Sequence, residues 1–256
     1  MCVQILFLNF QRTCVAELKN KLAGNDSFDA QSLVSLADYL TKKSVWIIGG
    51  DGWSYDIGYG GLDHALASGE NINVLLLDTE VYSNTGGQMS KSTPTGAVAL
   101  FAAAGKSMTK KDLGMQAMSY KHVYVASISL GANDAQAVKA IKEAEAYDGP
   151  SLIICYAHCI AHGIDLKNGL EEQKKAVGCG SWLLYRYNPT LALEGKNPLT
   201  VDSKNPDFSK LSEYLYGENR FKRLKAENPE RAAMLLEKLQ GFIENRYDYY
   251  QKLAAM

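Results

Sequence analysis

The residues best suited to chemistry begin with a carboxylate set between two glycines. Asp51 lies in Gly50-Asp51-Gly52, which follows a short apolar run. Glycines let a backbone approach a ligand closely, and amides at the start of a following helix can meet a phosphate. A carboxylate beside a diphosphate is a hard oxygen ligand that suits Mg²⁺. Asp-Gly is also common in turns, so the motif alone leaves an ordinary turn as an equal alternative.

A second polar stretch, DTEVYSNTGGQ, runs from Asp78 to Gln88. It offers hydroxyls, backbone carbonyls and an amide. Thr79 and a nearby carbonyl could join Asp51 in one side of an octahedral Mg²⁺ shell, with phosphates or water completing it. Asn84, about thirty residues beyond the glycine motif, can donate a hydrogen bond to a substrate carboxylate or oxyanion. Asp78 and Glu80 could be ordinary solvated charges.

The elements that must position these residues can be predicted from hydrophobic periodicity. Short apolar runs at 44–48, 72–77, 123–128 and 151–155 predict buried strands, and 182–185 is a weaker fifth. Residues 27–40, 133–147 and 229–253 have helical spacing. Apolar strands that alternate with helices predict an α/β fold of three layers, with helices on both faces of a parallel sheet. Ligands of such sheets bind at the carboxyl ends of the strands, which is where both polar stretches lie.

We divide the chain into three parts. Residues 1–43 form a helical lead whose first residues fit no specific pattern. Residues 44–188 form the α/β domain. Residues 189–256 form an extended, proline-containing arm and a C-terminal helix, to which we assign no catalytic role.

Composition excludes several classes of protein. The net charge of the 256 residues is -1, which gives no electrostatic case for nucleic acid. No apolar run approaches the roughly 20 residues of a membrane helix, and the first ten residues lack the features of a signal peptide. The odd number of cysteines and the absence of a C-x-x-C pair argue against a disulfide framework. We expect a cytoplasmic protein whose five cysteines are mostly buried free thiols: Cys2, Cys14, Cys155, Cys159 and Cys179.

A dinucleotide-binding fold is a weak alternative. Gly58, Gly60 and Gly61 follow the first strand, and Asp78 could imitate a ribose-binding acid. Their spacing is G-x-G-G, however, and does not match the G-x-G-x-x-G fingerprint.

Longer stretches of the chain resemble a known family. Asp51-Gly52 followed by Asn84 resembles the diphosphate motif of thiamine diphosphate enzymes. The strings IIGGDGWSYDIGYGGLDHALASG, DTEVYSNTGGQMSKSTPTGAVALFAAAGK, KKDLG and SLIICYAHCIAHGI look like pyruvate:ferredoxin (flavodoxin) oxidoreductase. The resemblance implies that 44–188 has the thiamine diphosphate-binding fold and belongs to the C-terminal domain of a longer enzyme. That enzyme would convert pyruvate and coenzyme A to acetyl-CoA and CO₂, with electrons passed through iron–sulfur clusters.

The resemblance also implies roles for single residues. Asp51, the Thr79 hydroxyl and the Val81 carbonyl match the family's Mg²⁺ ligands. Asn84 matches the residue that contacts the oxo-acid, which makes it the candidate catalytic residue. Cys159 matches the last ligand of the [4Fe–4S] cluster nearest the thiamine, and His158 and His162 beside it are interpreted as polar loop packing. The diphosphate and thiazolium side would be lined by Gly50, Gly52, Trp53, Ser83 and Asn84.

Other parts of the family's machinery have no match in this sequence. One cysteine cannot hold a four-iron cluster, and Glu80 is a poor substitute for the glutamate that activates the thiamine in a separate pyrimidine-binding domain. We therefore expect turnover to need further domains or subunits, together with ferredoxin or flavodoxin, pyruvate and coenzyme A, in a dimeric enzyme without nucleic-acid or membrane partners. Two alternatives stay open: a fragment or module that keeps the fold without catalysis, and a self-sufficient thiamine-dependent decarboxylase.

Overall fold

The computed structural model describes residues 2–256, with side chains from Leu8 onward, so Met1 and the Cys2 side chain lie outside it. The chain forms two compact units, 1–45 and 46–256. The first contains helix α1 (Cys2–Leu22), helix α2 (Phe28–Leu36) and a 3₁₀ turn over Ala37–Leu40. The predicted helix at 27–40 thus begins where the Ser27 side chain accepts a hydrogen bond from Ala30 N–H, and its last turn tightens to 3₁₀ geometry. Helix α1 lies within the predicted helical lead 1–43, although its own residues fitted no specific pattern.

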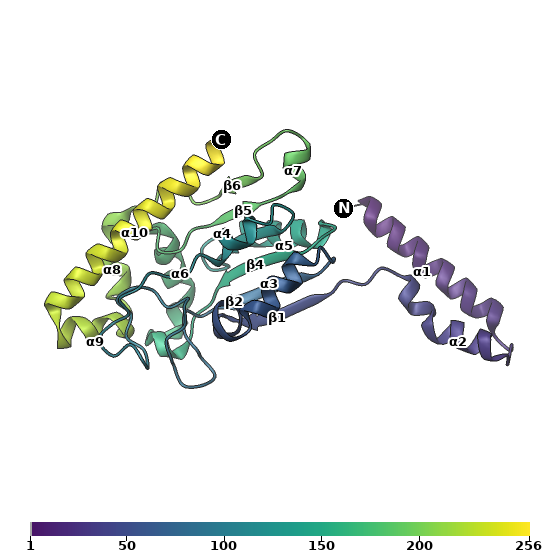
Figure 1. Ribbon diagram of the computed structural model, residues 1–256, viewed down its shortest axis with the longest axis horizontal. Helices are drawn as coiled ribbons and strands as arrows, with labels where there is room; N and C mark the ends of the chain where they lie inside the picture. The colour runs from purple at the N-terminus through teal and green to yellow at the C-terminus, as the bar shows by residue number, and fades with distance from the viewer. Residues whose placement is uncertain (1) are drawn as a thin grey trace. The chain divides into compact units, whose positions relative to one another are not determined.

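The second unit is built on a six-stranded sheet (Figure 1). Its spatial order is β1-β2-β4-β3-β5-β6. Strands β1, β2, β4 and β3 run parallel to one another, whereas β5 pairs antiparallel with β3 and β6 pairs antiparallel with β5. The strands are β1 (Trp46–Gly50), β2 (Asn73–Asp78), β3 (Tyr124–Ile128), β4 (Ser151–Tyr156), β5 (Tyr185–Tyr187) and β6 (Leu199–Val201).

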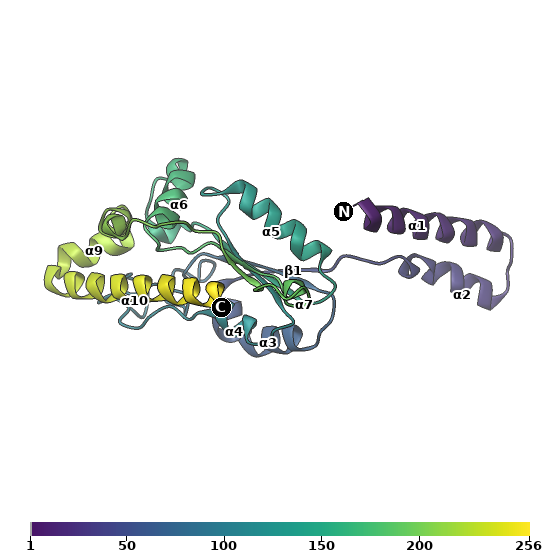
Figure 2. The same cartoon turned by 90° about the horizontal axis from the view of Figure 1, so that it is seen from above.

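Helices cover both faces of this sheet, which confirms the predicted three-layer α/β class. Figure 2 shows α5 on one side and α3, α4 and α10 on the other. The α5 face packs Ala137, Ala140 and Ala144 against Ile153 and its neighbours. The helices are α3 (Tyr59–Ala67), α4 (Leu113–Met118), α5 (Asp134–Ala146), α6 (Gly169–Gly178), α7 (Thr190–Leu193), α8 (Leu211–Leu215), α9 (Asn219–Glu227) and α10 (Pro229–Ala255).

The sheet departs from the prediction at its antiparallel edge. The weak fifth strand, expected parallel at 182–185, begins only at Tyr185 and pairs antiparallel with β3. Its neighbour β6 comes from the segment expected to be an extended arm. Strands of three residues carry too little periodicity to be predicted, and their direction depends on where the preceding loop returns the chain.

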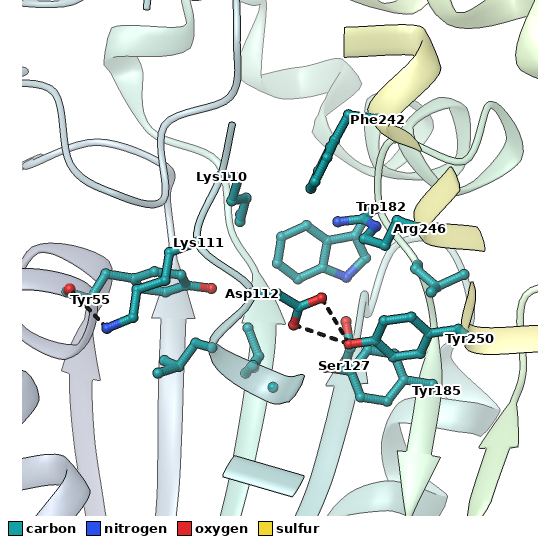
Figure 3. A pocket seen from close by; sticks show the side chains of 14 residues that line it. Tyr55, Lys110, Lys111, Asp112, Ser127, Trp182, Tyr185, Phe242, Arg246 and Tyr250 are labelled. Atoms are coloured by element: carbon teal, nitrogen blue, oxygen red, sulfur yellow. Dashed lines mark hydrogen bonds between the residues drawn. The ribbon is translucent and has the colours of Figure 1, made fainter. Parts of the chain in front are cut away.

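The C-terminal helix α10 packs against the α/β core. Asn228 caps it by accepting from Arg231 N–H, and Pro229 occupies its first turn. Figure 3 shows Tyr250 pointing from α10 to Asp112, beside a small cavity of about 40 Å³. The Tyr250 hydroxyl lies 3.0 Å from each Asp112 carboxylate oxygen, and Asp112 also caps α4. The tail is therefore part of the unit that carries the sheet. No helix among the described residues combines the length and the apolarity needed to cross a bilayer.

Residues 79–112, between β2 and α4, form a long loop that the tail helices hold in place. Val98 N–H donates to the Arg220 carbonyl at 2.8 Å. Arg231 and Lys238 donate from α10 to the Ala104 and Ser107 carbonyls. The loop thus has a fixed path although it lacks helices and strands of its own.

A turn of this loop supplies a test of its packing. Gly105 has φ +76°, and a Cβ there would lie 2.7 Å from Leu224 Cδ2 and 3.1 Å from the Gly96 carbonyl oxygen. We expect Gly105→Ala to lower the free energy of unfolding by about 2–4 kcal/mol, because left-handed backbone strain adds to overpacking. Gly241→Ala, at an open position within α10, should instead raise it by up to about 1 kcal/mol. Urea unfolding of both variants checks this, and equal effects would contradict the described packing.

Candidate thiamine diphosphate and metal site

The two polar stretches meet at the carboxyl edge of the sheet. Asp51 directly follows β1, and Thr79 directly follows β2. These strands are parallel neighbours with Gly50 opposite Leu77, so their ends deliver both side chains to one place. A single turn of π-helix, Gly52–Ile57, follows Asp51. Such turns occur often at functional sites.

The Thr79 hydroxyl lies at the centre of a group of oxygen atoms. Its Oγ1 is 2.9 Å from Asp51 Oδ1, 3.0 Å from the Val81 carbonyl oxygen and 2.7 Å from Ser83 Oγ. The hydroxyl has one hydrogen and cannot donate to all three. A carboxylate, a hydroxyl and a carbonyl that converge in this way are the donor set that Mg²⁺ prefers. The residues present therefore fit a magnesium ion.

The Asp51 carboxyl group is buried, with 1% of its surface exposed. Its second oxygen accepts a hydrogen bond from Ser90 Oγ at 2.6 Å. Burial and the nearby Asp78 carboxylate raise the pKa of Asp51 to about 6, against the hydrogen bonds from Ser90 and Thr79. A carboxylate that burial makes costly to ionise gains free energy when a cation binds beside it.

Glycines around the motif make room for aromatic rings. A Cβ at Gly49 would lie 2.5 Å from the Trp53 ring, and one at Gly58 would lie 2.1 Å from it. A Cβ at Gly52 would lie 2.6 Å from the Tyr82 ring. Gly50 has no such close neighbour. Trp53 thus occupies a slot that only glycine backbones leave open.

The remaining predicted lining residues come from the loop after β2. Ser83 is exposed, and its hydroxyl belongs to the group around Thr79. Asn84 is exposed as well, next to Ser83 in the chain. The structure therefore brings Asp51, Thr79, Val81 and Ser83 together and leaves Asn84 open to solvent.

Asp78 and Glu80, which could have been solvated charges, are instead buried in a chain of ion pairs. Lys110 Nζ lies 2.8 Å from Asp78 Oδ2 and 3.0 Å from Glu80 Oε1. Arg220, from α9, lies 2.7 Å from Glu80 Oε2 and also pairs with Glu218. Burial raises the pKa of Glu80, but the charges of Lys110 and Arg220 outweigh this effect and lower the pKa to about 2. We call these five residues the buried ion network; the sequence interpretation missed it because Lys110 and Arg220 are distant in the chain.

Cys159 follows β4 at the same edge of the sheet. It is buried, and its Sγ accepts a hydrogen bond from Ala161 N–H across a 3₁₀ turn over Ile160–His162. His162 Nε2 lies 2.7 Å from the Thr79 carbonyl oxygen, which ties the Cys159 loop to the loop 79–112 that follows β2. Burial and Arg220 lower the pKa of His162 to about 3, so its ring is neutral.

Sequence reasoning missed Ser90 as well. Ser90 holds Asp51 from the far side of the loop, 39 positions along the chain. A lone serine in a polar stretch has no spacing signal, so only the fold identifies it. The cysteines outside the site match the expectation of free thiols: Cys155 and Cys179 are buried, and Cys14 is exposed.

Comparison with known proteins gives a family match at this site. Residues 31–155 match the family described as thiamine pyrophosphate enzyme, C-terminal TPP binding domain. That range contains β1, β2 and every residue of the oxygen cluster around Thr79.

Curated relatives extend the similarity over nearly the whole chain. The pyruvate-flavodoxin oxidoreductase of Trichormus variabilis is 60% identical over 249 residues, which are 96% of this chain and 21% of that protein. The pyruvate:ferredoxin oxidoreductase of Moorella thermoacetica is 62% identical over 217 residues, 85% of this chain and 18% of that protein. A probable pyruvate-flavodoxin oxidoreductase of Escherichia coli is 50% identical over 244 residues, 95% and 20% of the two chains. The chain spans about a fifth of the length of the relatives it matches. Residues 31–155 are thus similar to the thiamine pyrophosphate-binding domain family, and most of the chain is similar to one part of the pyruvate:ferredoxin and pyruvate-flavodoxin oxidoreductases.

Proposed function

We propose that this chain binds thiamine diphosphate through Mg²⁺ and serves as the cofactor-binding part of a pyruvate:ferredoxin or pyruvate-flavodoxin oxidoreductase. When bound, thiamine diphosphate supplies a nucleophilic carbon and an electron sink for the decarboxylation of a 2-oxo acid. The chain's own contribution is to hold, orient and enclose that cofactor.

One observation carries the proposal: Asp51 Oδ1, the Val81 carbonyl and the Ser83 hydroxyl all lie within 3.0 Å of Thr79 Oγ1. Asp51, Thr79 and the Val81 carbonyl would hold the metal ion. The narrow backbone at Gly50 and Gly52 would let the diphosphate approach, and the Trp53 ring would form a wall of the site. The nearby relatives' names support pyruvate as the substrate.

Asn84 would orient the substrate. Its exposed amide lies in the same loop as the proposed metal ligands, where it can donate a hydrogen bond to the carboxylate of a 2-oxo acid. A positioned donor of this kind acts on the reacting molecule directly, so Asn84 is the chain's candidate catalytic residue.

Cys159 would supply one thiolate to a [4Fe–4S] cluster. Thiolates are the usual ligands of such clusters. The Cys159 loop is hydrogen-bonded through His162 to the carbonyl of Thr79, a proposed metal ligand. Because the chain spans about a fifth of its relatives, we propose that turnover in the cytoplasm needs their remaining parts. These would include a pyrimidine-binding domain, the other cluster ligands and a second subunit, with coenzyme A and ferredoxin or flavodoxin as reactants.

Calorimetric titration with thiamine diphosphate tests this proposal. We expect binding in the presence of Mg²⁺ that is lost when EDTA removes the metal, because the diphosphate and Asp51 repel each other without a cation between them. The titration should be repeated with the remaining domains added, which we expect to tighten binding and to permit pyruvate-dependent reduction of ferredoxin. Binding that is indifferent to Mg²⁺ in both forms would contradict the proposal, as would turnover by the chain alone.

A further inference from the structure

A group of histidine and carboxylate side chains lies beside the oxygen cluster around Thr79 and is linked to it by His162 Nε2. His158 and His162 flank the Cys159 loop, and Glu218 precedes α9. One ligand atom from each of the three lies within 4.8 Å of the other two. His162 and Glu218 have no exposed surface, and His158 is partly exposed.

Two ring nitrogens in this group are buried without a hydrogen-bond partner among the described residues: His158 Nε2 and His162 Nδ1. The tautomer of His162 follows from its other nitrogen. Nε2 lies 2.7 Å from the Thr79 carbonyl oxygen, which can only accept, so Nε2 carries the hydrogen. The lone pair of neutral His162 is then on Nδ1.

This lone pair faces the Glu218 carboxyl group, which pairs with Arg220 and accepts a hydrogen bond from the Tyr214 hydroxyl. His162 Nδ1 lies 4.0 Å from Glu218 Oε1, too far for a hydrogen bond. Two acceptors that face each other in a buried space repel unless a positive charge or a donor lies between them. The five residues of the buried ion network, Glu218 included, contain three carboxylates and two cations, so the network as a whole carries one net negative charge.

We propose that His158, His162 and Glu218 bind a single Zn²⁺ ion. Two imidazole nitrogens and a carboxylate oxygen are a known zinc donor set, with water in the fourth position. The bond from His162 Nε2–H to a backbone carbonyl is the outer contact that metal-binding histidines usually make. Bond lengths of about 2.0–2.2 Å place tetrahedral ligand atoms about 3.3–3.5 Å apart. On binding, the 4.0 Å gap between His162 Nδ1 and Glu218 Oε1 would close by about half an ångström, and a pair separated by the full 4.8 Å would close by about 1.3–1.5 Å.

A cavity adjoins the His162 side of this group. A cavity of about 430 Å³ is lined in part by His162, Asn219 and Arg220. Asn219 follows Glu218 in the chain, Arg220 pairs with it, and His162 Nδ1 lies 4.0 Å from its Oε1. His158 is partly open to solvent on its own side.

The test is metal binding by the purified chain. After dialysis against a chelator, we expect the chain to take up one equivalent of Zn²⁺, and Co²⁺ in its place to give the visible absorption of a four-coordinate ion. His158→Gln and Glu218→Gln should each weaken Zn²⁺ binding at least tenfold. His158→Gln is the more informative variant, because this side chain is partly exposed and its replacement should leave the melting temperature of the metal-free chain unchanged.

Two matched controls separate this site from other metal ligands. His64→Gln removes an exposed histidine of α3, and Cys159→Ser removes the thiol between the two histidines; both should keep full Zn²⁺ affinity. Failure to take up Zn²⁺, or unchanged affinity in either His158→Gln or Glu218→Gln, would overturn the proposal and leave a bridging water in the gap. Loss of binding in Cys159→Ser would also overturn it. Failure here leaves the thiamine proposal untouched, because that proposal is read out by Mg²⁺-dependent cofactor binding.

Discussion

Asp51→Asn is expected to weaken Mg²⁺-dependent thiamine diphosphate binding by about 10- to 100-fold. The substitution keeps the shape of the side chain and removes the only charge that the oxygen cluster around Thr79 offers to the cation. Interactions with a charged group contribute about 1.5–3 kcal/mol, and each 1.4 kcal/mol is tenfold in affinity. Calorimetry at saturating Mg²⁺ measures the change directly.

The same substitution should not harm the fold. Burial raises the pKa of Asp51 to about 6, so the ionised carboxylate is held at a cost that asparagine avoids. We expect the melting temperature of the metal-free variant to be equal to that of the parent or higher. A site that reduces stability in return for binding is common among functional residues.

Asp63→Asn is the matched control for Asp51→Asn. Asp63 lies on α3, and its Oδ1 accepts a hydrogen bond from the Tyr120 hydroxyl, which an asparagine oxygen can also accept. This variant should bind thiamine diphosphate like the parent. Equal affinity of the Asp51→Asn variant and the parent would show that Asp51 is not a metal ligand.

The parallel half of the sheet was predictable because each strand is a nearly continuous apolar run. Residues Leu152, Ile153 and Ile154 of β4 are buried on both faces. A short continuous apolar run of this kind is typical of a strand covered on both faces of a parallel sheet. The helix α5 was predictable for a similar reason, since its cap at Asn133 and its alanine face are both local signals. By contrast, β5 and β6 are set by where a long loop returns, and no local pattern contains that information.

The site divides in the same way. The proximity of Asp51 and Thr79 was predictable because the carboxyl ends of parallel strands lie at one edge of a sheet. The burial of Glu80 could not be foreseen, because its partner Arg220 lies 140 positions away in the chain. An acidic residue in a polar loop is usually solvated, and only the packing of α9 against that loop makes this one an exception.

Arg220→Met is expected to lower the free energy of unfolding by about 3–5 kcal/mol. The Arg220 side chain is 4% exposed and pairs with Glu80 and Glu218, which are 8% and 0% exposed. Methionine fills much of the same volume but leaves the buried Glu218 carboxylate without its cation, and Glu80 with Lys110 alone. Removing one partner of a buried ion pair costs this amount because the remaining charge is uncompensated. Urea unfolding gives the difference.

Arg223→Met, on the same helix, is the control for Arg220→Met. Arg223 is 65% exposed and pairs with Glu227, which is 54% exposed. Exposed pairs contribute about 0–1 kcal/mol, so this variant should unfold nearly as the parent does. Adding Glu80→Gln and Glu218→Gln to Arg220→Met should recover part of the lost stability, because neutral amides replace the uncompensated charges. Equal free energies of unfolding for Arg220→Met and Arg223→Met would show that the buried ion pairs of Arg220 do not hold the loop 79–112 against α9.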